Sequence, residues 1–268
     1  MADIAEVIMS RNLELTGVLD ENNLASGLAS RNGLLAYLLG NTQIKSYLLP
    51  HVKIVSLERN LVLYEQGDRI DSVYFPIDSV VSSLAIMEDG TTLETSMIGP
   101  EGFTGMSAIL GSGISRQWHW VLISGNAVQV DARLLDTLFL QHEDALKLLL
   151  NFYRSLMTQL SQRCVCNTRH TVLERLACWL LMLHDRVGGA NLRLTQEVIA
   201  SRLGARRAGI TVAAGVLQSM HSIEYRRGQL YIRDREMLER AVCECYAIMR
   251  SDFRLTPPPR PSHAGFSL

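Results

Sequence analysis

The sequence predicts an α+β chain in which an N-terminal antiparallel β-roll is followed by a long helix and a C-terminal winged helix–turn–helix. Three observations support this prediction. The first half holds short β-branched runs between turn signals, the middle holds a heptad stripe, and the last part holds a helix–turn–helix spacing followed by a basic hairpin. The 268 residues suffice for one large domain or two modest ones, each with its own core.

The composition is that of an ordinary globular protein, with 47% hydrophobic and 20% charged residues. No apolar run approaches the roughly 18 residues that span a bilayer, and the first residues lack the basic start and apolar block of a secretory signal. We therefore expect a soluble, cytoplasmic protein with no membrane partner. In a reducing compartment, the five cysteines are expected to be thiols rather than a disulfide framework.

Three segments of the chain differ in their amino-acid composition. Residues 1–42 mix short apolar stretches with Asn, Ser and Gly, and we expect a loosely held extension with at most two short helices. Residues 43–142 are expected to form the β-roll, because runs such as VKIVSL, LVLY and WHWVLISGNAVQV alternate with glycine-containing turn signals. The proline-rich ending, residues 256–268, has little to bury and is expected to be a flexible tail.

Residues 143–167 are expected to form one long helix, because apolar residues recur there at alternating spacings of four and three. Such a stripe is either the seam of a homodimer, which we favour, or the face by which a helix packs on its own domain. The stripe consists of Leu146, Leu150, Tyr153, Met157, Leu160 and Cys164.

Residues 168–255 are expected to form a winged helix–turn–helix. Ala200 is small enough for a crossing helix to approach, Gly204 four residues later suits a tight turn, and Ile210 begins the buried face of a second helix. This spacing of a small residue, a glycine and a β-branched residue is typical of the motif. Such a unit places the N-terminal end of its second helix against base edges in the major groove. The alternative is two ordinary core helices with exposed arginines.

Charge and a following hairpin favour the DNA-binding interpretation. Residues 1–167 carry 11 basic and 18 acidic side chains, whereas residues 168–256 carry 14 and 9, and all 14 are arginines. Arginine can bind a phosphate or a guanine edge through two parallel hydrogen bonds. A strand, a basic turn and a second strand between residues 222 and 232 have the pattern of a wing. The candidate DNA contacts are Thr195, Gln196, Arg206, Arg207, Thr211, Arg226 and Arg227.

In this order, the parts resemble the Crp/Fnr superfamily of bacterial transcription regulators, named for the cyclic-AMP receptor protein. The resemblance covers about residues 43–250 and rests on GPEGFTGMSAILGSGISR, on the heptad helix, and on the segment from HTVLERLACWLLMLHDRVG to CECY. It implies a cyclic-nucleotide-binding-like roll, a homodimer that binds two-fold symmetric DNA, and contact with RNA polymerase.

The resemblance also implies an effector pocket, at the position where the family's nucleotide site reads Gly-Glu and then Arg-Ser-Ala. The matching residues here are Gly105 and Met106, then Arg116, Gln117 and Trp118. Met106 stands where the glutamate would bind the ribose, and Trp118 brings an indole where alanine leaves room. We therefore expect a sensor domain that does not respond to cyclic AMP and has an unidentified small-molecule effector or none.

Metal and catalytic chemistry find little support in the sequence. Cysteines two residues apart occur at 164–166 and 243–245, but both pairs are expected in helices, where side chains at that spacing point about 200° apart. We therefore expect no metal, no cofactor and structural thiols, with Cys164 on the stripe as the best redox candidate. His170 and His184 are expected to be satisfied or exposed. Motifs of nucleophile elbows, phosphate loops and zinc proteases are absent, so we expect no enzyme.

The function that these observations favour is sequence-specific, dimeric DNA binding in transcription regulation. Two alternatives stay open: a regulatory or scaffold module whose winged helix docks a protein, and a constitutive DNA-binding regulator without an effector.

Overall fold

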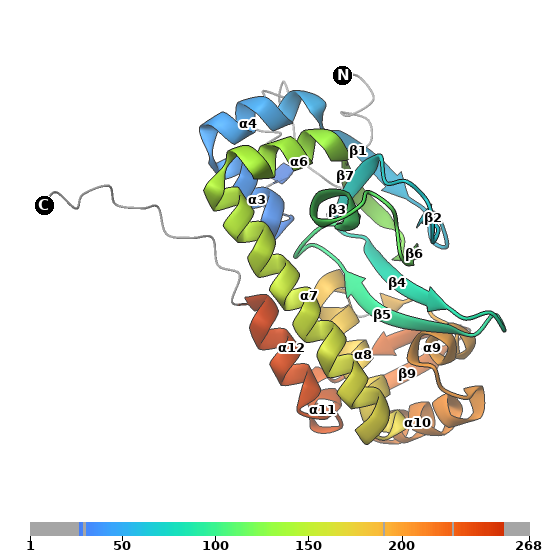
Figure 1. The fold of residues 1–268 in the computed structure, drawn as a ribbon. Helices are drawn as coiled ribbons and strands as arrows, with labels where there is room; N and C mark the ends of the chain where they lie inside the picture. Colours follow the sequence, from blue (N-terminus) through green and yellow to red (C-terminus); the bar gives the residue numbers. More distant parts are fainter. Residues whose placement is uncertain (1–26, 29–30, 190, 227, 255–268) are drawn as a thin grey trace, which may run out of the picture.

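The computed structural model describes residues 27–28, 31–189, 191–226 and 228–254. It has the predicted α+β architecture, with a β-roll and a winged helix–turn–helix arranged along one long helix, α7 (Figure 1). Within this described part, none of the helices combines the length and apolar character that a bilayer crossing requires.

Two antiparallel sheets form the roll, with strand orders β1–β7–β3 and β2–β6–β4–β5. The first five residues of β4 are all buried. The two faces of the strand pack against different cores, since Val80 belongs to the core beneath the winged helix and Val81 to the interior of the roll. The strands are β1 (Lys53–Leu57), β2 (Val62–Tyr64), β3 (Ser72–Pro76), β4 (Val80–Ile86), β5 (Thr92–Ile98), β6 (Trp118–Ile123) and β7 (Gly125–Asp131).

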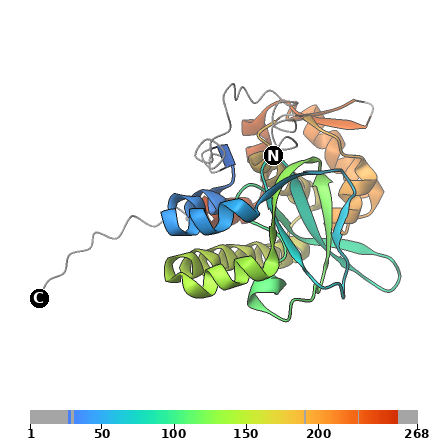
Figure 2. The ribbon, with the colours of Figure 1, turned by 90° about the horizontal axis from the view of Figure 1, so that it is seen from above.

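Short helices close one end of the roll. Seen from above, α3 and α4 lie beside the strands, next to α6 and α7 (Figure 2). The helices of the first half are α3 (Gly33–Gly40), α4 (Thr42–Leu48), the 3-10 turn η1 (Leu49–His51), α5 (Ser107–Leu110) and α6 (Ala132–Gln141).

The expectation of a loosely held extension is wrong for residues 33–40. Helix α3 is apolar almost throughout, and Leu35 and Leu38 are fully buried in the core of the roll. The buried Asn32 caps α3 and donates its amide to the carbonyls of Pro76 and Gly102, which ties the helix to the roll. Residues 1–26, together with 29 and 30, and the expected tail, residues 256–268, lie outside the described residues.

Helix α7 (Glu143–Arg169) is the 27-residue element that joins the two halves. Its first half is anchored to the roll by packed aromatic rings. The ring centroids of Phe152 and Phe103 lie 5.7 Å apart in a tilted pair, and Phe103 in turn stacks on Phe75 with centroids 5.2 Å apart. Gly102 makes room for this contact, because a Cβ atom at that position would lie only 2.0 Å from the ring of Phe152. The aromatic core therefore fixes the position of α7 against the roll.

The winged helix–turn–helix packs around α8, which starts with a capping box between Thr171 and Glu174. Its small sheet has the order β8–β10–β9, and α12 runs back along α7 (Figure 1). The elements are α8 (Val172–Val187), β8 (Asn191–Leu192), α9 (Gln196–Leu203), α10 (Arg207–Ser219), β9 (Ile223–Arg226), β10 (Gln229–Ile232), α11 (Arg235–Arg240) and α12 (Cys245–Arg254).

Candidate nucleic-acid interface

The turn between α9 and α10 has the geometry that the sequence spacing predicts. The hydroxyl of Thr195 caps α9 by accepting from the backbone N–H of Val198. Gly204 ends the helix in the left-handed conformation, with φ of 56°, where a side chain would be strained. Ala200 and Ile210 are both buried, so α10 crosses close over α9.

The N-terminal end of α10 presents positive charge to solvent. Arg206 occupies the N-cap position and Arg207 begins the helix; both side chains are exposed, and the first turn holds no acidic residue. Two further candidates meet at this edge, because the hydroxyl of Thr211 donates to the side-chain oxygen of Gln196 at 2.7 Å. The structure thus gathers Thr195, Gln196, Arg206, Arg207 and Thr211 around the start of the two helices.

The wing is a hairpin of β9 and β10 in regular antiparallel register. Arg226 is exposed near its tip and pairs with Glu224 of the same strand, which also binds Arg233. The hydrogen bond from Arg233 holds the pKa of Glu224 below its usual range. The wing charge is therefore partly neutralised within the hairpin. Arg227, the other wing candidate, lies outside the described residues.

Sequence reasoning missed an apolar strip on the same helix. Val212 is 69% exposed and Val216 is 39% exposed on the outer face of α10. Their positions fall out of phase with Ile210, Ala213 and Leu217, which are buried, and this phase was the signal that could have found them. Exposed valines can contact thymine methyl groups or an apolar protein surface.

Two of the five expected effector residues line one pocket. Met106 and Arg116 face a pocket of about 420 Å³ between α5 and α7, together with Leu150 and Tyr153 of α7. The pocket therefore lies between the roll and the apolar stripe. An occupant would touch both.

The other three expected effector residues are not part of that lining. Gly105 is buried with φ of 90° beneath Tyr64, and Gln117 donates to the hydroxyl of Thr95 at 3.0 Å instead of facing the pocket. Trp118 begins β6 and pairs with Leu84 of β4. Trp118 is absent from the lining of this pocket, so the expected crowding by its indole is not found there.

The heptad stripe lies on the outer face of α7. Leu150 is 49% exposed, and Tyr153 and Met157 are each 42% exposed, which is unusual for large apolar side chains on one helix face. Cys164 is exposed, whereas Leu146 and Leu160 are half-buried. A different set faces the protein's own core: Ala145, Leu148, Leu149, Phe152, Ser155, Leu156, Gln159, Arg163 and Cys166.

Buried polar groups on the inner face of α7 join the roll to the helix–turn–helix. The Gln159 amide accepts from the N–H of Met97 and donates to its carbonyl, in effect extending β5. One turn further, Arg163 donates to the carbonyl of Glu94 at 2.9 Å and to that of Arg202 in α9 at 3.3 Å. The side chain of Glu94 accepts in turn from the indole of Trp179. Sequence reasoning missed this network, although polar residues four apart opposite an apolar stripe were its signal.

The cysteine pairs behave differently from each other. Cys164 and Cys166 point to opposite sides of α7, as helix geometry predicts, since the first is exposed and the second buried. The expectation that residues 243–245 lie within a helix is wrong, because Cys243 precedes α12 and only Cys245 belongs to it. Helix geometry therefore does not force the side chains of Cys243 and Cys245 to opposite sides, and both are buried.

Comparisons with known proteins agree with this architecture. Residues 174–241 match the family described as the Crp-like helix-turn-helix domain. No curated protein matches the chain.

Solved structures with the same fold come from several bacteria. FixK2 from Bradyrhizobium japonicum is 17% identical with a TM-score of 0.60, over 72% of this chain and 98% of its own. A CRP-family transcriptional regulator from Thermus thermophilus is 19% identical with a TM-score of 0.59, over 70% and 95%. The c-di-GMP-responsive global regulator CLP of Xanthomonas campestris is 17% identical with a TM-score of 0.53, over 75% and 98%. At these identities the likeness shows a shared fold.

Proposed function

We propose that this protein is a sequence-specific DNA-binding regulator that binds two-fold symmetric DNA as a homodimer. It carries a Crp-like helix-turn-helix domain at residues 174–241 and has the fold of the Crp/Fnr transcription regulators. The observation that supports it most is the exposed, basic N-terminal end of α10 on a helix–turn–helix with the expected crossing. A regulator of this kind would act in the cytoplasm, would contact RNA polymerase, and would need no enzymatic activity.

In the proposed complex, α10 enters the major groove with its N-terminal end foremost. Arg206 and Arg207 would read base edges, since a guanidinium can bind guanine through two hydrogen bonds. Thr195 and Gln196 at the start of α9 would meet a backbone phosphate, with Thr211 joined to Gln196 beside them. Arg226 and Arg227 of the wing would contact a neighbouring phosphate.

The homodimer is proposed on the exposed stripe of α7. A single chain leaves Leu150, Tyr153 and Met157 in water, and pairing two such helices would bury them against each other. A parallel pair would also bring two pockets, each lined by Met106 and Arg116, to the seam. We propose that any small-molecule effector binds there and shifts the population of dimers competent for DNA. Because Met106 offers no carboxylate, a cyclic nucleotide is not the occupant that we favour.

Binding-site selection with a double variant tests the assigned contacts. Arg206→Ala combined with Arg207→Ala should lose the base preference of the wild type, since each bidentate arginine contact contributes about 1–3 kcal/mol of discrimination. Arg240→Ala is the matched control, an exposed arginine at the end of α11. An unchanged selected sequence from the double variant would contradict the assignment.

The exposed valines of α10 favour one second candidate, docking of a protein partner through Val212 and Val216. The salt dependence of binding distinguishes DNA binding from protein docking. Binding to DNA through several phosphates weakens steeply as salt rises, whereas an apolar docking surface is nearly insensitive to it.

A further inference from the structure

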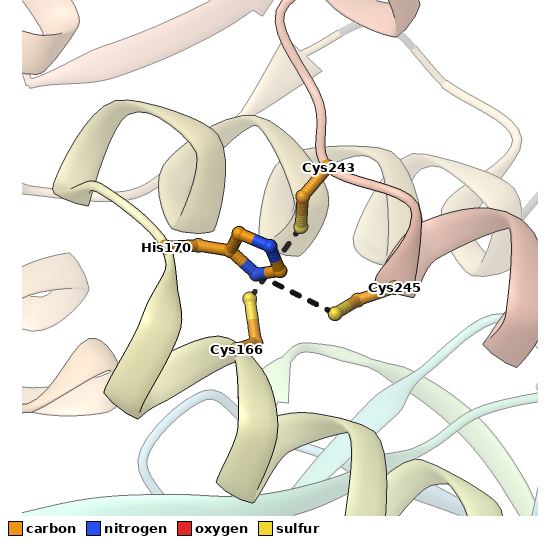
Figure 3. Close-up of side chains that lie close together, drawn as sticks. All are labelled: Cys166, His170, Cys243 and Cys245. Atoms are coloured by element: carbon orange, nitrogen blue, oxygen red, sulfur yellow. Dashed lines mark hydrogen bonds between the residues drawn. The ribbon is translucent and has the colours of Figure 1, made fainter.

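Four side chains that bind metals converge where α7 meets the winged helix–turn–helix. Cys166 lies in the last turn of α7, His170 in the link to α8, Cys243 just before α12, and Cys245 at its first residue. Their side chains point toward one another from these four positions (Figure 3). All four ligand atoms lie within 4.8 Å of one another, with the three cysteines buried and the histidine half-buried.

The spacing of these atoms is that of ligands around a single ion. The sulfurs of Cys166 and Cys243 are 3.6 Å apart, and the Cys245 sulfur lies 3.6 Å from Nδ1 of His170. A tetrahedral zinc ion with bonds of about 2.3 Å to sulfur and about 2.0 Å to nitrogen places its ligands about 3.5–3.8 Å apart. Two of the six ligand pairs therefore already have the separation of zinc ligands, and the other pairs lie within 4.8 Å.

We propose that Cys166, His170, Cys243 and Cys245 bind one zinc ion in a tetrahedral site of three thiolates and one imidazole. Three cysteines and one histidine are a usual ligand set of structural zinc sites, and all four positions are filled by protein. On binding, the three thiols release their protons to solvent and the ion takes their place. This proposal goes beyond DNA binding and does not depend on it.

An iron–sulfur cluster fits the same residues less well. The protein ligands of a cluster attach to different iron atoms, so that their sulfur atoms lie further apart than ligands of one ion. Here every pair of ligand atoms is within 4.8 Å. The compact arrangement favours a mononuclear ion.

An outer carboxylate completes the arrangement expected of a metal-binding histidine. Nε2 of His170 lies 3.5 Å from the carboxylate of Glu244, while Nδ1 faces the Cys245 sulfur. A carboxylate on the far nitrogen fixes the imidazole tautomer and turns the unprotonated nitrogen toward the metal. The sequence CEC thus supplies two ligands and, between them, the group that orients the third.

The position of the site gives the ion a structural role. Cys166 and Cys243 are separated by 77 residues, and the helix–turn–helix and its wing lie between them. An ion would hold the two ends of this domain together and fix both to the end of α7. Cross-links that close long loops stabilise a fold most in principle. Chelation should therefore lower the melting temperature of the full-length protein.

Metal content of the full-length protein, purified under reducing conditions and reconstituted with zinc, tests the proposal. We expect about one zinc per chain by elemental analysis, lost in Cys166→Ser and in Cys243→Ser. Cys164→Ser is the matched control, since it lies on the same helix two residues away and is exposed; it should retain the zinc. Wild-type protein without zinc, or ligand variants with as much zinc as wild type, would overturn the proposal.

Cobalt substitution keeps the test valid if a serine variant fails to fold. Wild-type protein titrated with Co²⁺ should show tetrahedral ligand-field bands together with thiolate charge-transfer absorption at one ion per chain. His170→Cys retains four ligands and should keep the ion with a spectrum shifted toward four thiolates, whereas His170→Ala should bind it more weakly. An octahedral spectrum, or purified protein that carries iron with acid-labile sulfide, would contradict a zinc site.

Discussion

His119 on β6 is a titratable side chain that is half-buried in the roll. Its ring meets that of Tyr64 edge-on at 5.2 Å, and its Nδ1 lies 3.2 Å from the hydroxyl of Ser83. Burial lowers the pKa of His119 to about 4, because the charged imidazolium would lose its hydration there. The neutral ring is thus part of the packed roll.

This histidine should make the fold sensitive to acid. The unfolded chain binds its proton near pH 6.5 and the folded chain only near pH 4, so that stability falls as the pH drops through this window. The loss attributable to His119 approaches about 3 kcal/mol at the acidic end. Urea unfolding at pH 7 and pH 4.5 should show a smaller difference in His119→Asn than in wild type. The matched control is His51→Asn, the same substitution at an exposed histidine. Identical pH dependence in His119→Asn and wild type would contradict this assignment.

The two faces of helix α7 have different roles. Its outer face holds the exposed apolar stripe, while its inner face holds Gln159 and Arg163, which bind the roll and the helix–turn–helix. Because Arg163 is buried and hydrogen-bonded to both halves, it ties the position of α9 to that of β5. A shift of the roll against α7 would reach the DNA-binding helices through this contact.

Removal of Arg163 should therefore cost stability. Arg163→Ala leaves the buried carboxylate of Glu94 without its cation and two carbonyls without a donor, which is expected to cost about 3–5 kcal/mol. Arg169→Ala, exposed on the same helix, should cost no more than about 1 kcal/mol. Denaturant unfolding measures both, and equal losses would show that the network contributes nothing beyond an ordinary surface arginine.

Local sequence signals determined most elements and some of the site. The turn at Gly204 and the cap at Thr195 follow from residue types at fixed spacings, which is why the helix–turn–helix could be predicted. Helix α3 could not, because its burial depends on Asn32 reaching carbonyls 44 and 70 residues away. The convergence of residues 166, 170, 243 and 245 depends likewise on α12 folding back along α7. Contacts between distant segments leave no periodic trace in a single sequence.

At the scale of the whole molecule, the proposed assembly depends on the outer face of α7. Met157→Glu places a charge in the middle of the exposed stripe, and two such charges would face each other across a seam. We expect this variant to sediment as a monomer under conditions where the wild type is a dimer. Leu140→Glu is the control, since Leu140 is 74% exposed on α6 rather than on the stripe. This control variant should sediment as a dimer, like the wild type. A dimeric Met157→Glu would place the seam elsewhere.

The most direct test of a dimeric DNA-binding regulator is selection of binding sites from a randomised duplex pool by the full-length wild type, with Met157→Glu in parallel. We expect the wild type to enrich a two-fold symmetric site whose half-sites lie about one helical turn apart. The monomeric variant should enrich at most a single half-site. Enrichment of an unsymmetrical site by the wild type, or of no site with and without the zinc ion in place, would contradict the account.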